Sequence, residues 1–281
     1  MKRLMLAAPA SGSGKTVLTC GLLAALTARG IGAEAFKCGP DYIDPMFHQK
    51  VLGVPSRNLD LFLQGERGVR RTLAKQSRPV ALIEGAMGYY DGVNGTDQAS
   101  AWHLATAAKL PVVLAVRPGG SSLTLAAQIQ GLQKFRPDSR LRGLLLTLCK
   151  SSLHAHLKPI LERETGLPVL GYLPPLEAAR IESRHLGLIL PEEIPELKGR
   201  LLKLAEVLEN SLEIEEILKS QREKQARLKK ELGNRWRGKE ELGDLVFTTS
   251  MGSPCSRYIV EKEIKKVIKR MREKEAVLAV Q

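Results

Sequence analysis

Short runs of apolar residues recur along the first 175 positions and alternate with segments of helical spacing. The runs are apolar throughout rather than at every second position, which is typical of strands covered on both faces of a sheet. The expected strands are Lys2–Ala8, Pro79–Glu84, Leu110–Val116, Leu141–Leu148 and Pro168–Tyr172, and the expected helices are 16–29, 97–109 and 152–165. This order predicts an α/β fold with a doubly wound, mostly parallel sheet over about residues 1–175. A ligand crevice is then expected at the carboxyl ends of the strands.

The pattern changes after Pro191. Leucine recurs every three or four residues from Leu197 to Leu212, which describes one face of an amphipathic helix that can pack on the sheet. Residues 219–243 are charged and poor in apolar side chains, as in a solvated helix or a linker. We therefore expect a main domain over 1–218, a charged linker over 219–243 and a short basic α/β appendage over 244–281.

Composition limits the classes of protein to consider. The 281 residues include 43 Lys and Arg against 30 Asp and Glu, which gives a formal net charge of +13. A basic chain favours polyanionic partners such as nucleotides, nucleic acid or acidic metabolites. The four scattered cysteines form neither a disulfide framework nor a zinc motif. No apolar run reaches the roughly 18 residues of a membrane span, so we expect a cytoplasmic protein with no membrane partner.

A loop rich in glycine and serine, Ala8-Pro-Ala-Ser-Gly-Ser-Gly-Lys-Thr16, joins the first expected strand to the first expected helix. A triphosphate needs closely spaced backbone N–H donors, an ammonium group and a hydroxyl that ligates magnesium. The loop matches the end of the pattern G-x-x-x-x-G-K-[ST], although Pro9 stands at the first glycine. The sequence therefore predicts a sheet of the P-loop NTPase type that binds ATP and Mg²⁺, with a solvated turn as the alternative. The expected nucleotide-binding residues are Ser11, Gly12, Ser13, Gly14, Lys15, Thr16 and Val17.

Two acidic loops supply the carboxylates that P-loop chemistry requires for the metal and the phosphate acceptor. The first loop, Lys37-Cys-Gly-Pro-Asp-Tyr-Ile-Asp-Pro45, contains Asp41 and Asp44. In the second, Glu84 ends an apolar strand and Asp91 follows in a glycine-rich loop. Carboxylates at strand ends project into the expected crevice. Turn-forming aspartates and a capping glutamate are the alternative interpretation.

These loops give the chain a specific resemblance. It resembles the amino-terminal synthetase domain of the cobyrinic acid a,c-diamide synthase family, which is related to dethiobiotin synthetase. The matching stretches cover about residues 1–218 and are, in order, APASGSGKT, KCGPDYIDPMFH, SRNLDLFL, IEGAMGYYDG, GLPVLGYLP and ESRHLGLILPEE. The resemblance implies an ATP-dependent carboxylate–amine ligase of cobalamin biosynthesis. ATP would phosphorylate carboxylates a and c of the corrin macrocycle, and ammonia would then displace phosphate to leave amides.

The resemblance also implies roles for the matching residues. Lys15 would neutralise charge on the transferred phosphoryl group, while Thr16 and Glu84 would hold the metal, with Asp41 as a further ligand. Asp44 and Asp91 would orient the acceptor carboxylate or the ammonia. The expected catalytic residues are Lys15, Asp41, Asp44, Glu84 and Asp91, and the expected substrate contacts are Lys37, Tyr42, Asp44, Tyr90 and Asp91.

Arg117-Pro118-Gly119 stands where an acidic or amide residue is common in the family, and three further features depart from the family pattern. Thr147 stands near the place of a family asparagine that can read adenine, which leaves base selectivity open. The glutamine amidotransferase domain that follows in the family is not found, so we expect a truncated fusion, inactive or dependent on free ammonia or a separate glutaminase subunit. Residues 221–281, chiefly the part after 244, resemble an interior piece of a phage-type tyrosine recombinase without its catalytic elements. Nucleic acid is therefore not the expected partner.

Other functions stay open on the sequence alone. The acceptor could be another tetrapyrrole acid or a smaller carboxylate. The chain could instead be a ParA/MinD-like switch ATPase that dimerises on ATP, or a DNA-binding protein that uses its basic tail. A homodimer is also compatible with the ligase. The acidic loops favour the amidoligase over both non-ligase alternatives.

Overall fold

The computed structural model describes residues 2–175 and 197–212, and within them it forms one seven-stranded parallel sheet in the order β3-β2-β4-β1-β5-β6-β7. The strands are β1 Lys2–Ala7, β2 Ala33–Cys38, β3 Ser56–Leu59, β4 Val80–Glu84, β5 Val112–Val116, β6 Leu141–Thr147 and β7 Val169–Leu173. The longer helices are α1 Lys15–Ala28, α3 Leu61–Ala74, α4 Ala101–Ala107, α5 Leu123–Lys134, α6 Ser151–Thr165 and α7 Leu197–Ser211. Short helical turns are α2 Ile43–Met46, η1 Phe47–Val51 and η2 Val93–Gly95. The prediction of an α/β fold with a parallel sheet is confirmed.

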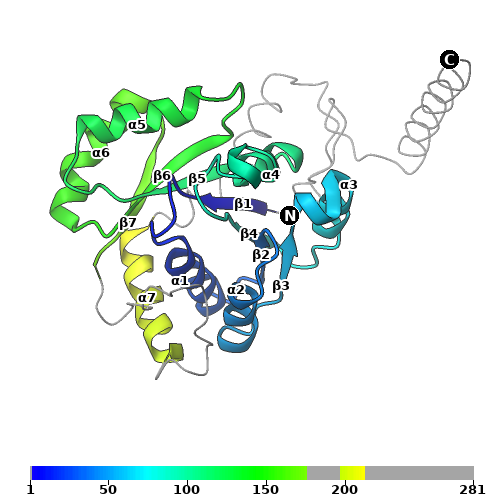
Figure 1. The fold of residues 1–281 in the computed structure, drawn as a ribbon. Coiled ribbons are helices and arrows are strands. Elements are labelled where there is room, and N and C mark those ends of the chain that lie inside the picture. Colours follow the sequence, from blue (N-terminus) through cyan, green and yellow to red (C-terminus); the bar gives the residue numbers. More distant parts are fainter. Residues whose placement is uncertain (1, 176–196, 213–281) are drawn as a thin grey trace, which may run out of the picture. The chain divides into compact units, whose positions relative to one another are not determined.

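Helices cover both faces of the sheet, as Figure 1 shows. In β1, Leu4 and Leu6 face α1 and α7, whereas Met5 and Ala7 belong to the opposite core beneath α3, α4, α5 and α6. Because successive side chains of a strand point to opposite faces, a strand buried on both sides has to be apolar at every position. That requirement explains the uninterrupted apolar runs in the sequence.

The strand order places the phosphate loop near the middle of the sheet. The chain leaves β1 for β2 and β3 on one side, returns as β4 beside β1, and then continues through β5, β6 and β7 on the other side. This reversal of direction creates the crevice at the carboxyl ends of the central strands where α/β proteins bind ligands.

Helix α7 packs against α1 on one side of the sheet. Its Leu201, Leu204 and Leu208 are buried, which confirms the apolar face expected from the leucine spacing. Contact with α1 is close because Gly21 has no side chain, and a Cβ atom there would lie 2.8 Å from Leu204 Cγ and would also overlap Leu208. Helix α7 therefore packs on α1, and both helices lie on this side of the sheet. In Figure 1 the yellow α7 lies beside the dark blue α1.

The predicted element limits differ from the observed ones by a few residues, apart from the helix expected over 97–109, which is shortened to Ala101–Ala107. The strands β2 and β3 were not among the expected strands, because Glu34, Lys37, Arg57 and Asn58 interrupt their apolar character. The chain divides into two units, residues 1–220 and 221–281. The expected linker over 219–243 and the appendage over 244–281 lie outside the described residues. None of the described helices has the length and apolar character needed to cross a membrane.

Replacing Gly21 with alanine is expected to destabilise the fold, because the added methyl group has to displace α7 from α1. Overpacking of this kind costs about 1–3 kcal/mol. The matched control is Gly131→Ala in α5, where a Cβ atom meets nothing within 4 Å. There the better helix propensity of alanine should raise the free energy of unfolding by up to about 1 kcal/mol. Urea denaturation measures the free energy of unfolding of both variants. Equal changes in this free energy for the two substitutions would contradict the tight contact between α1 and α7.

Candidate functional site

The phosphate loop lies between the end of β1 and the start of α1. Gly12 and Gly14 have φ values of 74° and 85°, which are left-handed conformations that favour glycine. A Cβ atom on Gly12 would meet nothing within 4 Å, so the backbone conformation and not the space requires glycine there. Because Gly14 ends the loop and begins α1, the first amides of that helix are directed to the place where an anion would bind.

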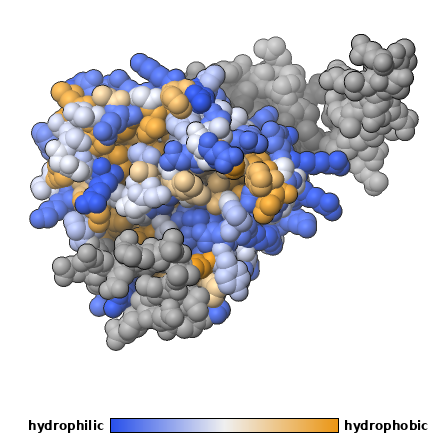
Figure 2. Space-filling model, viewed as in Figure 1, coloured by the Kyte–Doolittle hydropathy of each residue, from blue (hydrophilic) through white to orange (hydrophobic). Residues whose placement is uncertain are grey.

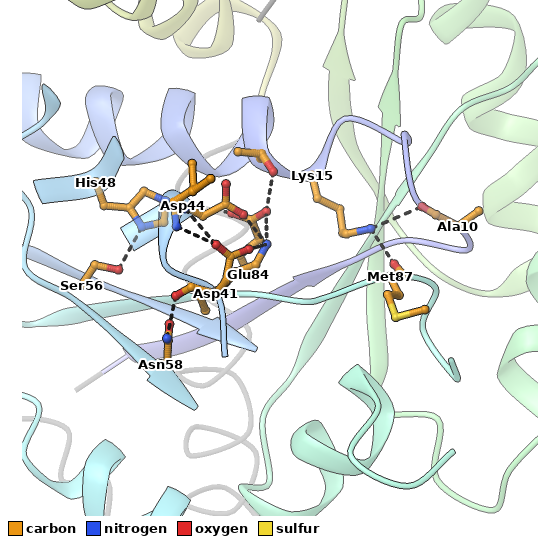
Figure 3. Close-up of polar contacts among 12 residues, drawn as sticks. Ala10, Lys15, Asp41, Asp44, His48, Ser56, Asn58, Glu84 and Met87 are labelled. Atoms are coloured by element: carbon orange, nitrogen blue, oxygen red, sulfur yellow. Dashed lines mark hydrogen bonds and ion pairs between the residues drawn. The ribbon is translucent and has the colours of Figure 1, made fainter. Parts of the chain in front are cut away.

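Lys15 folds back over this loop. Its Nζ donates hydrogen bonds to the carbonyl oxygens of Ala10, at 3.3 Å, and Met87, at 2.6 Å. Figure 3 shows the side chain directed to these two carbonyls and away from the acidic residues. Burial lowers the pKa of Lys15 below its ordinary value, against the opposing effect of Glu84. Met87 has a φ of 49°, a conformation that costs a non-glycine residue about 1 kcal/mol or more.

Glu84 connects the phosphate loop to the first acidic loop. It ends β4, where the sheet register places it beside Leu6 of β1 on one side and Lys37 of β2 on the other. Its Oε1 accepts hydrogen bonds from Thr16 Oγ1, at 2.6 Å, and from Lys37 Nζ, at 2.8 Å. The parallel register therefore brings together three residues that lie far apart in the sequence.

The carboxylates of the first acidic loop surround the same ammonium group. Lys37 Nζ lies 2.5 Å from Asp44 Oδ2 and 3.8 Å from Asp41 Oδ2. Asp41 also shapes its own loop, because its Oδ1 accepts hydrogen bonds from the backbone amides of Ile43 and Asp44. Asn58 of β3 donates to the Asp41 carbonyl oxygen at 2.6 Å. We call Lys37, Asp41, Asp44 and Glu84 the acidic cluster.

Lys37 is held in its charged form. Burial by itself favours the neutral amine, but the nearby carboxylates of Glu84 and Asp44 outweigh that effect and raise the pKa of Lys37 above its ordinary value. Both the ammonium and the carboxylate of Glu84 are buried. Removal of one partner from such a buried pair leaves an uncompensated charge.

His48 lies behind Glu84 and was not assigned a role from the sequence. Its ring is fully buried, with Nδ1 3.0 Å from Ser56 Oγ and Nε2 4.0 Å from Glu84 Oε2. Burial lowers the pKa of His48, which favours the neutral imidazole. Among the described residues, Nε2 of His48 and Oε2 of Glu84 have no hydrogen-bond partner. The sequence did contain a signal, since this histidine ends the stretch KCGPDYIDPMFH.

The oxygen ligands fit a magnesium ion that arrives with a nucleotide. Mg²⁺ prefers hard oxygen ligands and is usually held by one or two carboxylates, waters and substrate phosphates. Thr16 and Glu84 touch at the end of the phosphate loop, and Oε2 of Glu84 is a buried oxygen that accepts no hydrogen bond from another described group. Within residues 2–175 and 197–212, no three His, Cys, Asp or Glu side chains form a ready-made metal site. Thr16 and Glu84 are therefore the residues that would hold the ion. Asp41 as a further ligand stays a prediction, since its Oδ2 lies 3.8 Å from Lys37 Nζ.

Not all expected site residues join the acidic cluster. Asp91 Oδ2 accepts a hydrogen bond from the Gly88 amide at 3.1 Å and stays exposed in the loop after β4. Tyr42 is 77% exposed beside the first acidic loop. Tyr90 is turned elsewhere, because its hydroxyl donates to the Leu132 carbonyl oxygen of α5 and its ring packs near Trp102 and Phe135. The structure thus brings together Thr16, Lys37, Asp41, Asp44 and Glu84 and leaves Tyr90 apart.

Thr147 supports the phosphate loop. It is fully buried, its hydroxyl donates to the Ser13 carbonyl oxygen at 2.9 Å, and its methyl group lies 3.7 Å from the Cβ position of Gly14. In the sequence, Thr147 stands near the position of a family asparagine that can recognise adenine. The structure instead gives its polar group to the loop backbone, so Thr147 has no hydroxyl hydrogen left for a base.

Exposed apolar side chains follow the carboxyl ends of several strands, either in the loops or in the first turns of the next helices. Figure 2 shows orange hydrophobic areas separated by a mainly hydrophilic surface. Six large apolar side chains in the described part of the chain follow the ends of β2, β3, β4, β5 and β6 by seven residues or fewer. They are Tyr42, Phe62, Leu63, Met87, Leu123 and Leu148, which we call the apolar rim. Apolar surface around a polar site is typical of a binding face.

Known proteins resemble the chain over most of its length. Cobyrinate a,c-diamide synthase of Clostridium acetobutylicum is 43% identical over 212 residues, which are 75% of this chain and 48% of that protein. The synthases of Gloeobacter violaceus and Listeria innocua are 41% and 39% identical and cover 74% of this chain and 47% of each relative. The chain thus spans about half the length of the curated relatives it matches.

Among solved structures, the MinD cell division protein of Aquifex aeolicus aligns with a TM-score of 0.46 at 14% identity and covers 75% of this chain and 97% of that chain. The fold assignment rests on the sheet order and the phosphate loop rather than on this likeness.

A family match covers the phosphate loop, both acidic loops and all of the sheet except the first two residues of β1. It extends over residues 4–189, and the family is described as the CobQ/CobB/MinD/ParA nucleotide binding domain. These comparisons give no support to the recombinase resemblance of residues 221–281, which also lie outside the described residues. On the strength of the matched range and of the site geometry, the chain belongs to the CobQ/CobB/MinD/ParA nucleotide-binding domain family.

Proposed function

We propose that the chain is the synthetase part of an ATP-dependent ligase that amidates carboxylates a and c of cobyrinate. The observation that carries this proposal is the contact between Thr16 of the phosphate loop and Glu84, which shares its Oε1 with Lys37. A switch ATPase needs only the nucleotide side of such a site. Here the carboxylate that touches Thr16 also belongs to the acidic cluster of four charged side chains, and we expect the γ-phosphate to end beside it, as a carboxylate-activating site requires. The identity of about 40% with cobyrinate a,c-diamide synthases supports the choice of acceptor.

The proposed reaction gives the carboxylate a better leaving group before ammonia attacks it. A carboxylate resists attack by ammonia because oxide would have to leave. In the first step a carboxylate oxygen attacks the γ-phosphorus of ATP, the bond to the β,γ-bridging oxygen breaks, and ADP leaves. In the second step the ammonia nitrogen attacks the acyl carbon, phosphate leaves, and the nitrogen loses a proton. Phosphate is a far better leaving group than oxide, so the second step then proceeds.

The residues of the site divide this work. Amides of the phosphate loop and the start of α1 would bind the phosphates, and Lys15 would exchange its two carbonyl partners for phosphate oxygens. Magnesium, held by Thr16 and Glu84, would offset the negative charge of the transferred group. Asp44 and Asp91 would orient the acceptor or the ammonia. Asp41, through its two amide contacts, would keep the loop that carries Asp44 in shape.

The apolar rim fits the proposed acceptor. A corrin has a broad apolar ring with carboxylates on side chains at its edge. The rim could contact the ring while a peripheral carboxylate reaches the acidic cluster, because both lie at the carboxyl ends of the strands. Tyr42 belongs to the same loop as Asp44, and the Met87 carbonyl oxygen accepts a hydrogen bond from Lys15, so these two rim residues are directly linked to the site.

The ammonia has to come from outside the described residues. Free ammonium or a separate glutaminase subunit are the two proposed sources. The purified chain with ATP, Mg²⁺ and cobyrinate is expected to form amide and phosphate with ammonium chloride but not with glutamine. Mass spectrometry of the corrinoid measures the product, with a sample lacking ATP as the control. Amide formed from glutamine as efficiently as from ammonium would contradict the proposal, and so would the absence of product from both.

Removal of the charges that face the transferred phosphoryl group is expected to abolish most of the turnover. Lys15→Ala and Glu84→Gln should each lower kcat by roughly 100-fold to 1000-fold, since each removes an electrostatic group that acts on the transition state. The matched control is Glu66→Gln on α3, an exposed carboxylate that contacts Arg70 one helical turn away and lies 4.0 Å from His103 Nε2. Its kcat should be unchanged. Phosphate release with cobyrinate and ammonium present measures all three, and full activity in Lys15→Ala and Glu84→Gln would reject the mechanism.

A further inference from the structure

The ammonium of Lys37 occupies the centre of the acidic cluster. Its three carboxylate neighbours, Asp41, Asp44 and Glu84, lie 3.8, 2.5 and 2.8 Å from Nζ. Figure 3 shows that these groups come from the loop after β2 and from the end of β4, and that Lys15 is directed to other partners. One monovalent cation is therefore enclosed by three oxygen donors of the kind that divalent cations prefer.

The same ammonium holds one oxygen of the carboxylate that would bind the metal through its other oxygen. Lys37 Nζ donates to Oε1 of Glu84, the atom that also accepts the Thr16 hydrogen bond. Glu84 is fully buried and Lys37 is 6% exposed, so water screens this contact poorly. A divalent cation brought next to Glu84 would lie within a few ångströms of the ammonium, and two cations at that distance in a buried site repel each other strongly.

We propose that the Lys37 ammonium is the built-in counter-ion of the acidic cluster and that it excludes a divalent cation until a nucleotide supplies further negative charge. This inference rests on the proposed nucleotide site but not on the identity of the acceptor. A bound triphosphate adds several negative charges and further oxygen ligands beside Thr16 and Glu84. The site can then hold the ammonium and the metal together. Because of the Lys37 ammonium, a divalent cation then binds only together with the nucleotide.

The described ligand set agrees with such an order of binding. Residues 2–175 and 197–212 contain no cluster of three His, Cys, Asp or Glu side chains that could hold a metal alone. Two buried carboxylate oxygens in these ranges lack a hydrogen bond, Oε2 of Glu34 and Oε2 of Glu84. Oε2 of Glu34 lies 3.6 Å from the guanidinium of Arg57. Glu84 differs, because Lys37 donates a hydrogen bond to the other oxygen of its carboxylate, Oε1. Lys37 thus controls access to the carboxylate that also touches Thr16.

Manganese binding without nucleotide tests the proposal, because the electron paramagnetic resonance signal of free Mn²⁺ decreases when the ion binds. The full chain is titrated with Mn²⁺ alone, as wild type and as Lys37→Met, which keeps an unbranched side chain but removes the charge. We expect Lys37→Met to bind Mn²⁺ roughly tenfold or more tightly than the wild type, since one buried repulsion is removed. The matched control is Lys15→Met, a buried lysine whose hydrogen bonds go to carbonyl oxygens, and it should gain far less.

A second measurement uses the wild type alone, in case Lys37→Met does not fold. Mn²⁺ alone should leave the Tm of the wild type unchanged, whereas Mn²⁺ with a non-hydrolysable ATP analogue should raise the Tm above the value with the analogue alone. The proposal is overturned if wild type and Lys37→Met bind Mn²⁺ equally, if Lys15→Met gains as much as Lys37→Met, or if Mn²⁺ alone stabilises the wild type. No acceptor is present in either measurement, so failure of the amidation reaction would leave these readings unaffected.

Discussion

The site depends on one buried carboxylate that has two partners. Glu84 ends the strand beside β1, and its Oε1 accepts one hydrogen bond from the helix that follows the phosphate loop and another from the neighbouring strand β2. A buried carboxylate is stable only when charges and donors compensate it. Thr16 and Lys37 provide that compensation, and in doing so they fix the distance between the nucleotide side and the acidic side of the site. The other carboxylates then take their places around Lys37.

The same requirement links the fold to the chemistry. A parallel sheet places the ends of β1, β2 and β4 at one edge, and the register sets Leu6, Glu84 and Lys37 side by side. A shift of register by one residue would turn Glu84 to the other face of the sheet. The apolar packing of β4 on both faces opposes such a shift, since Val80, Ala81, Leu82 and Ile83 are all buried. The hydrophobic core thus holds the charged groups in position.

Much of this architecture could be predicted from the sequence, because short runs that are apolar at every position and lead into a glycine-rich loop occur in few folds besides parallel α/β sheets. The strands β2 and β3 escaped prediction since polar residues that serve the site or pair with other strands interrupt them, among them Lys37 and Asn58. Spacing also singled out the phosphate-loop lysine and the acidic loops. It could not show that Lys37 lies among three carboxylates, because that contact depends on strand order. Nor could it show that Tyr90 packs against Trp102 of α4 and against Phe135, which follows α5. His48 ends one of the stretches that carry the resemblance, but its contacts with Ser56 and Glu84 are visible only in three dimensions.

The hydrogen bond from Thr147 to Ser13 has a consequence for protein engineering. It ties the end of β6 to the backbone of the loop that follows β1, two segments 134 residues apart in the chain. An asparagine introduced at this position to alter nucleobase preference would have to fit a fully enclosed space beside Gly14 and replace that tie. Changes in purine discrimination and changes in triphosphate affinity would then arise together from a single mutation. Redesign of base preference is better directed to exposed neighbours such as Leu148.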